Sequence, residues 1–292
     1  MRKHLSTILL ILIFLTGVIL LLYPTFSDWW NSFHQSRAVV SYIGSVTDLN
    51  NEEYEKMLEE AREYNAQLAR TRTDYELSEE EMERYNAELN VSGTGIMGYV
   101  DIPSIRVTLP IYHGTEEAVL QTAVGHIEST SLPVGGANTH CVISGHRGLP
   151  SARLFTDIDR LTAGDLFTLN VLDEVLTYEV DQILIVEPYD LSCLQIIPGR
   201  DLVTLVTCTP YGINTHRLLV RGHRIETEGG KVSNIRVMAD AIQVDKTLVA
   251  VFIAVPVLLV LIVMVLIITG IQRRRNRRRN TLQAYILARG TV

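Results

Sequence analysis

Cys208 and Arg217 are two residues whose types and spacing can support acyl transfer. Leu202 to Thr207 reads as a strand of apolar and β-branched residues, and Pro210 must end it close to Cys208 because proline has no backbone N–H to donate. A second apolar run follows and carries Arg217. If the two runs pair as neighbours, Arg217 lies beside the thiol, and a nearby cation favours the nucleophilic thiolate. The alternative is a small buried cysteine with no chemical role.

His146 is the candidate general acid or base. It stands in Ser144-Gly-His-Arg-Gly148, directly after the β run Cys141–Ile143, at a second expected strand end. Four other histidines compete for this role, each with a structural alternative: His113, His126, His140 and His216. No histidine and cysteine pair has the spacing of a zinc site, so we expect no metal and no cofactor.

Several segments around these residues resemble the sortases, the cysteine transpeptidases of Gram-positive cell surfaces. Thr204-Leu-Val-Thr-Cys208 is similar to the TLxTC signature of that family. Three further stretches resemble its pilus-assembly subgroup, class C: Leu109-Pro-Ile-Tyr-His-Gly-Thr115, Val142-Ile-Ser-Gly-His-Arg-Gly-Leu-Pro150 and Pro210-Tyr-Gly-Ile-Asn-Thr-His-Arg217. The likeness extends from about Gly95 to Arg224.

The resemblance implies a fold and an activity. The fold is mainly β, a closed sortase-type barrel of about eight strands with an N-terminal helical and lid segment and two transmembrane helices. The activity is that of a membrane-bound cysteine transpeptidase, which cleaves an LPxTG-like sorting signal and joins pilin subunits through lysine isopeptide bonds. Cys208 would be the nucleophile, His146 the general acid and base, and Arg217 the residue that holds the substrate and stabilises the oxyanion.

Three alternatives stay open at this point. The chain could be a housekeeping-type anchoring sortase, a cysteine hydrolase that uses water as the acceptor, or a noncatalytic surface scaffold. The partners implied by the favoured reading are pilin proteins that carry a sorting signal and an acceptor lysine.

The barrel strands can be read from short β runs separated by turns. We expect them at 96–102, 107–112, 139–144, 166–171, 175–186, 202–207 and 216–225. Before them, apolar residues at helical spacing predict one helix from Asn51 to about Leu68, and a capping box predicts another that begins at Ser78. Asp74 and Tyr75 lie between these helices, where pilus sortases carry a lid that covers the active site. The family's usual lid proline is absent here.

Both ends of the chain are apolar enough to span a membrane. Leu5 to Tyr23 is an uncharged run, which we interpret as a retained anchor because a signal peptide usually has a shorter apolar region of about 7–15 residues. Leu248 to Ile271 is a second uncharged run, and Arg273–Arg279 follows it as a stop-transfer signal. We therefore expect a cell-membrane protein with an extracellular catalytic domain and both termini cytoplasmic, unless the N-terminal segment is cleaved.

The expected domain order follows from these segments. It comprises a membrane anchor or signal segment (1–23), a helical region with the lid (24–94), the catalytic barrel (95–230), a linker (231–247), a transmembrane helix (248–271) and a basic cytoplasmic tail (272–292). All 33 acidic residues lie between positions 24 and 272, whereas nine of the 26 basic residues lie outside that span. The strongly acidic middle argues against a nucleic-acid partner. Cys141 and Cys193 either pair or remain separate buried thiols.

Overall fold

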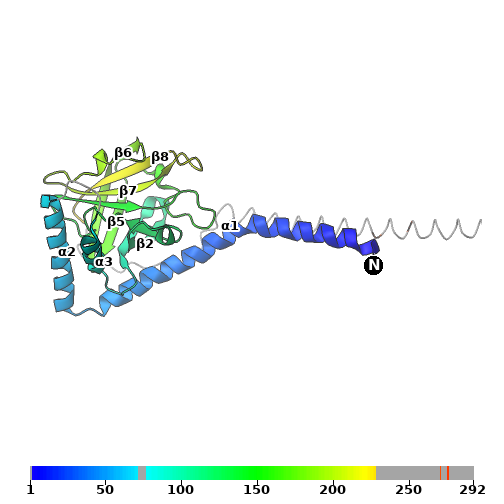
Figure 1. Cartoon of the computed structure of the whole chain (residues 1–292), viewed down its shortest axis with the longest axis horizontal. Helices are drawn as coiled ribbons and strands as arrows, with labels where there is room; N and C mark the ends of the chain where they lie inside the picture. Colours follow the sequence, from blue (N-terminus) through cyan, green and yellow to red (C-terminus); the bar gives the residue numbers. More distant parts are fainter. Residues whose placement is uncertain (1, 72–76, 228–269, 271–274, 276–292) are drawn as a thin grey trace, which may run out of the picture. The chain divides into compact units, whose positions relative to one another are not determined.

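The computed structural model describes residues 2–71, 77–227, 270 and 275. It shows a β-barrel that is preceded in the sequence by three helices (Figure 1). The contacts within the chain define two compact units. The unit Phe26–Val237 contains the barrel, and residues 1–25 belong to the other unit. The second expected span, 248–271, and the basic tail lie outside the described residues except for Gly270 and Arg275.

The barrel is closed and has eight strands in the order β1-β2-β3-β4-β7-β8-β6-β5. The pairs β2–β3 and β4–β7 are parallel, and the other neighbours are antiparallel. The strands are β1 Ile96–Ile102, β2 Val107–His113, β3 Val124–His126, β4 Thr139–Ser144, β5 Leu166–Val171, β6 Glu174–Val186, β7 Asp201–Thr209 and β8 His216–Arg224. The predicted mainly-β barrel is thus confirmed.

Short helical segments connect the strands. They are η1 Pro103–Ile105, α4 Glu117–Leu120, η2 Ile158–Arg160 and η3 Ser192–Leu194. The strands close around a core of fully buried side chains, among them Phe167, Tyr178 and Ile143. Phe167 and Tyr178 stack with their ring centroids 5.6 Å apart. This core gives the sheet a rigid frame for groups placed at the strand ends.

Two helices with the predicted apolar faces pack against the barrel. Helix α2 spans Asn51–Thr71 and buries Leu58, Ala61 and Leu68. Helix α3 spans Glu79–Ala87, and its N-cap Ser78 forms the predicted capping box with Glu81. Tyr85 is fully buried on the inner face of α3. These amphipathic faces therefore explain why both helices are held by the barrel.

The N-terminal helix is longer than the sequence suggested. Helix α1 spans Arg2–Thr47 and continues well past the expected apolar run, which ends at Tyr23. By length and composition, Ile11–Thr47 contains one stretch that could cross a membrane. Its later turns pack on the barrel instead, through buried Val39 and Tyr42. The helix thus combines an apolar segment with a segment that belongs to the barrel unit.

Candidate active site

The strand register places Cys208 and Arg217 directly opposite each other. They are Cα partners in the antiparallel pair β7–β8. Cys208 is the last residue but one of β7, and Arg217 is the second residue of β8. Residues directly opposite in such a pair have their side chains on the same face of the sheet. Cys208 is a free, partly exposed thiol. The sequence-predicted neighbours are therefore neighbours in the fold.

His146 lies at the end of the strand on the other side of β7. Strand β4 runs parallel to β7 up to the pair Ser144 and Val206, and the Gly145 N–H extends this ladder by donating to the Val206 carbonyl at 3.0 Å. His146 is the next residue. Its partly exposed ring has Nε2 3.7 Å from Oε2 of Glu117 on α4. All three predicted catalytic residues thus stand at one end of the barrel, on three adjacent strands or just beyond them.

Two cross-links hold the backbone around His146 against the backbone around Cys208. The Thr207 hydroxyl donates to the Gly145 carbonyl at 2.7 Å, and the Arg147 guanidinium donates to the Thr209 hydroxyl at 3.2 Å. These residues flank His146 on β4's extension and Cys208 on β7. Because successive strand residues point to opposite faces, the cross-links occupy one face and leave Cys208 on the other.

Gly145 is required by the close packing beneath this end. A Cβ atom built at Gly145 would lie 2.7 Å from a ring carbon of Phe155. The Phe155 N–H donates to the His146 carbonyl at 3.1 Å, which folds the following loop back under the histidine. Arg147 is held in turn by an ion pair with Asp159, and its guanidinium lies 5.9 Å from the centroid of the Tyr211 ring. The loop after β4 is therefore closely packed.

Each of the competing histidines has its ring engaged by other groups. His126 and His140 are buried, and burial lowers the pKa of His126 to about 4 and also lowers the pKa of His140. His113 has its two ring nitrogens on the carbonyls of Gly95 and Glu88, at 3.0 and 2.7 Å. His216 pairs with Thr209, is partly buried, and has its Nε2 3.4 Å from Oε1 of Glu187. Their surroundings suit structural roles better than that of an acid or base at Cys208.

The other two cysteines differ from Cys208 in their surroundings. All three thiols are free, so Cys141 and Cys193 do not pair. Burial in the barrel raises the pKa of Cys141 well above its usual range, which disfavours its thiolate. Cys193 is partly exposed on η3 and packs beside the apolar cluster of Val142, Val206 and Leu219. Val206 and Leu219 lie on the same sheet face as Cys208 and are buried, so a packed apolar cluster lies beside the thiol.

Two cavities lie near the described sheet, and neither is lined by Cys208, Arg217 or His146. One, of about 640 Å³, is lined by Arg147, Asp159, Ile183, Leu184, Ile185, Thr209, Pro210, Tyr211 and Leu218. Thr209 and Leu218 belong to the face opposite Cys208 and Arg217. Leu184, the partner of Leu219, lies on the Cys208 face, so this cavity is lined from both faces of the sheet.

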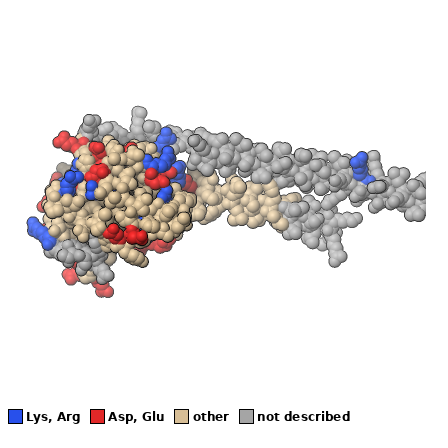
Figure 2. Space-filling view, turned by 90° about the horizontal axis from the view of Figure 1, so that it is seen from above, with Lys and Arg blue, Asp and Glu red and all other residues tan. Residues whose placement is uncertain are grey.

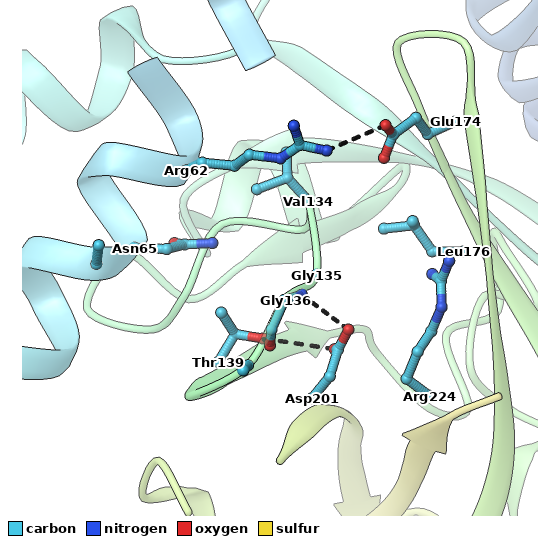
Figure 3. Close-up of a pocket in the computed structure, with 12 residues that line it drawn as sticks. Arg62, Asn65, Val134, Gly135, Gly136, Thr139, Glu174, Leu176, Asp201 and Arg224 are labelled. Atoms are coloured by element: carbon cyan, nitrogen blue, oxygen red, sulfur yellow. Dashed lines mark hydrogen bonds and ion pairs between the residues drawn. The ribbon is translucent and has the colours of Figure 1, made fainter. Parts of the chain in front are cut away.

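The other cavity, of about 370 Å³, lies at the far end of β4 and β7 (Figure 3). Its lining includes Arg62 of α2, which forms an ion pair with Glu174 at 3.2 Å, and Asp201 at the start of β7. The Asp201 carboxylate accepts from the Gly136 N–H at 2.8 Å, while burial raises its pKa. Asp201 is seven positions before Cys208 on the same strand, roughly 23 Å. This cavity is therefore remote from the predicted active site.

The predicted lid lies outside the described residues, whereas two residues that were not predicted lie near the candidate active site. Asp74 and Tyr75, the predicted lid residues, lie within 72–76 and stay a prediction. Glu117 and Arg147 are near the site but were not singled out from the sequence. Arg147 had a signal in its position directly after His146, whereas Glu117 had none because its approach depends on the packing of α4. Within residues 2–71 and 77–227, no group of three or more His, Cys, Asp or Glu side chains is arranged to hold a metal ion.

Comparisons with known proteins agree with this fold. A family model described as Sortase domain matches residues 100–225. Sortase C1 from Streptococcus agalactiae is 52% identical, with a TM-score of 0.64, and the match covers 65% of this chain and 99% of that chain. Sortase C from Streptococcus pneumoniae is 44% identical, with a TM-score of 0.58 and coverage of 65% and 97%.

A further solved structure and the curated relatives extend the comparison. Clostridium perfringens sortase C is 42% identical, with a TM-score of 0.59 and coverage of 66% of this chain and 100% of that chain. Sortase D of Bacillus subtilis is 30% identical over 131 residues, which are 44% of this chain and 63% of the relative. The chain thus spans less than two thirds of that relative and 47% of Sortase A from Streptococcus agalactiae. The chain belongs to the sortase family, and its solved structural neighbours place it with the class C sortases.

Proposed function

We propose that this protein is a membrane-bound cysteine transpeptidase that polymerises pilin subunits. The observation that carries the proposal is the β7–β8 register, in which Cys208 stands opposite Arg217 while His146 ends the neighbouring strand. Related solved structures support the same direction. The structure of Streptococcus pneumoniae sortase C is described as informative about pilin substrate specificity, and that of Clostridium perfringens sortase C is described as containing the C-terminal cell wall sorting motif.

The first step is attack of the Cys208 thiolate on the threonine carbonyl carbon of an LPxTG-like signal. A C–S bond forms and the Thr–Gly C–N bond breaks, which leaves a thioacyl-enzyme. The departing amine needs a proton, and His146 is the group in this proposal that supplies it.

The second step is attack of a lysine ε-amine of another pilin on the thioester carbonyl. The C–S bond breaks, an isopeptide bond forms, and the proton lost by the amine returns to His146, so that the enzyme is regenerated. Arg217 stabilises the negative charge that develops on the carbonyl oxygen in both steps, because its guanidinium is a permanent cation with several N–H donors. The acceptor amine distinguishes this reaction from hydrolysis.

The proposal also places the barrel on the outer side of the membrane, between two spans. The N-terminal span is the apolar part of α1. The second span is the uncharged segment 248–271, which the following arginines would hold in the membrane with the tail inside. The pilin partners, the acceptor lysine and this topology rest on the resemblance and the sequence.

Intact-protein mass spectrometry tests the proposal with the full chain in detergent. Incubation with an LPxTG-containing peptide should add the acyl fragment to the wild type and to Cys193→Ala, but not to Cys208→Ala. Cys193 is the matched control because it is also a free, partly exposed thiol. A lysine-containing acceptor peptide should then discharge the adduct as an isopeptide product.

Each other outcome points to a different function. Discharge by water at the same rate with and without the lysine peptide would indicate a hydrolase, and discharge only by a cell-wall amine would indicate an anchoring sortase. An adduct that persists on the Cys208→Ala protein would refute the assignment of the nucleophile. A protein that forms no adduct, while Cys208→Ala still supports pili in cells, would be a noncatalytic scaffold.

A further inference from the structure

Four large aromatic side chains of α1 are exposed as one group. Phe26, Trp29, Trp30 and Phe33 are 47–60% exposed and stand on consecutive turns of the helix. Their rings contact one another, with centroids 5.8 Å apart for Phe26 and Trp29 and 6.4 Å apart for Trp29 and Phe33. We call these four residues the aromatic cluster. A contiguous apolar surface of this kind marks a site of contact with a membrane or a partner.

The chain itself indicates which of these covers the cluster. From His4 to Ser27 the sequence has no Asp, Glu, Lys or Arg, and Asp28 is the first charged residue after this apolar segment. In Figure 2 the described stretch of α1 that precedes the barrel is correspondingly tan. Trp29 is only six residues beyond Tyr23, about 9 Å of helix. Tryptophan is enriched at the level of the lipid headgroups, so the occupant that fits the cluster is the membrane interface.

Hydrogen bonds attach this part of α1 to the end of the barrel that carries His146. Asn31 Nδ2 donates to the Ser151 carbonyl at 2.9 Å, and the Arg153 N–H donates to the Asp28 carboxylate at 2.9 Å. Ser151 and Arg153 are in the loop that follows His146 and is tied back to it by Phe155.

A third contact reaches the other element that faces His146. Gln35 Nε2 donates to the Thr122 carbonyl at 2.7 Å. Thr122 follows α4, whose Glu117 lies 3.7 Å from the His146 ring. The aromatic cluster is therefore joined to both segments that surround the predicted general acid and base.

The opposite end of the barrel is attached much further along α1. The Tyr42 hydroxyl donates to the Met97 carbonyl at 2.9 Å and accepts from the Leu172 N–H at 2.7 Å. Leu172 is in the β5–β6 turn, two residues before Glu174, which lines the remote cavity. Tyr42 is thirteen positions beyond Trp29, about 20 Å of helix. Helix α1 is therefore hydrogen-bonded to the His146 end of the barrel near the aromatic cluster and to the opposite end at Tyr42.

We propose that the aromatic cluster is seated among the lipid headgroups and holds the His146 and Cys208 end of the barrel toward the membrane surface. The proposal rests on the proposed function only in naming that end catalytic. Its consequence is that the catalytic residues meet substrate segments at the depth of the headgroups, while the cavity beside Asp201 faces away from the membrane.

Intrinsic fluorescence gives a direct test, because the chain contains only two tryptophans, Trp29 and Trp30. The full chain is placed in nanodiscs of phosphatidylcholine whose acyl chains carry bromine either near the headgroup or near the bilayer midplane. Bromine near the headgroup should quench the emission severalfold more than bromine at the midplane. Equal emission in brominated and unbrominated lipid would overturn the proposal, since the cluster would then be covered by protein or water.

A second measurement tests the direction of the barrel. A fluorescent label is placed at Ser151→Cys or, as the matched control, at Ala137→Cys, an exposed residue in the loop before β4. Both are made with Cys193→Ala and Cys208→Ala, while Cys141 is shielded by burial. Energy transfer to a headgroup-labelled lipid should be stronger from position 151 than from position 137.

Equal transfer, or stronger transfer from position 137, would overturn the proposed direction even if the tryptophans are at the interface. Neither readout requires catalysis. The membrane placement can therefore fail while the transpeptidase proposal stands, and it can hold if the acyl-enzyme is never observed.

Discussion

At the scale of single residues, the Arg217 side chain is held by backbone carbonyls of the turn that precedes it. Its Nη1 atom donates to the carbonyls of Asn214 and His216, at 3.3 and 3.2 Å. Lysine would keep the charge at this position but would lose the planar fork that makes several N–H bonds at once. Because these contacts are made to backbone oxygens at a strand end, we expect the fold to tolerate the exchange better than the chemistry does.

Arg217→Lys should lower the single-turnover rate of acylation by on the order of 10²-fold, the usual effect of removing one oxyanion donor. The thermal unfolding midpoint should change little. Arg200→Lys is the matched control, since Arg200 is half exposed and lies at the other end of β7. A near wild-type acylation rate in Arg217→Lys would show that the guanidinium acts only as a charge or takes no part.

The hydroxyl of Thr209 provides a second prediction at this scale. It accepts the hydrogen bond from Arg147 and so joins the loop of His146 to the strand of Cys208. Thr209→Val removes that bond at nearly constant shape, whereas Thr209→Ser retains it. A buried bond to a charged group contributes about 1.5–3 kcal/mol, so we expect at least a tenfold slower acylation for valine. The single-turnover acylation rate of Thr209→Ser should be close to that of the wild type. If both variants acylate equally fast, the cross-link does not position the two catalytic residues.

The position of a single residue in the fold could be predicted only where the neighbouring sequence determines it. Cys208 could be placed at a strand end because Pro210 follows it within the sequence. Local pattern could not separate His146 from His126, because the burial of His126 depends on contacts with Tyr85, 41 residues earlier. The approach of Glu117 to His146 is likewise a tertiary contact. Long-range packing therefore decides which histidine remains accessible.

At the scale of elements, strong periodicity was informative and short segments were not. The ranges of β1, β4 and β5 were predicted as they stand in the structure. Strand β3, only Val124–His126, was missed because three residues with a central glycine show no alternation. The region from residue 24 was expected to be helical, but the continuation of the N-terminal helix to Thr47 was not specified, since its polar residues mask a packing face that is completed by the barrel. Such elements are specified by their partners rather than by their own sequence.

The attachment of α3 to the barrel makes stability depend on pH. The Tyr85 hydroxyl lies 3.0 Å from His126 Nδ1, and His126 Nε2 lies 2.8 Å from the Ser131 carbonyl. Burial lowers the pKa of His126 to about 4, below the ordinary value of about 6.5 that applies in the unfolded chain. The unfolded state therefore binds more protons between these two values, and stability must fall as the pH decreases through that window.

From pH 7 to pH 5, His126 alone should reduce the free energy of unfolding by roughly 2 kcal/mol. His140, whose pKa is also lowered by burial, should add to the effect. Urea denaturation at the two pH values measures the change. The matched variant is His126→Gln, which has no titrating ring and should show a clearly smaller pH dependence, whatever its absolute stability. An equal pH dependence in both proteins would mean that His126 is not the residue responsible.

At the scale of the whole molecule, charge and apolar character are distributed by segment. The barrel unit carries acidic and basic side chains interspersed on the face seen in Figure 2, whereas α1 has none from His4 to Ser27. The two long uncharged runs flank the barrel in the sequence, and the arginine-rich segment follows the second of them. Under the proposed topology the barrel would be tethered at both ends, and its position at the membrane would be restricted from two sides.

The topology that follows from this distribution is the last prediction. Arginines flanking a span are retained on the cytoplasmic side, so Arg2 with Lys3 and the six arginines of 273–279 should both lie inside. Residues 24–247 would then be outside. Protease added to intact protoplasts should digest the barrel unit and spare a small fragment that carries a C-terminal epitope tag.

Permeabilised protoplasts provide the control, because the tag should be lost once protease reaches the cytoplasm. Replacing the six arginines by glutamine should weaken the retention of the tail and make the tag partly accessible from outside, since the positive charges that oppose translocation are gone. A tag that is digested in intact protoplasts carrying the wild-type chain would contradict the predicted orientation, because the tail would then lie on the same side of the membrane as the barrel.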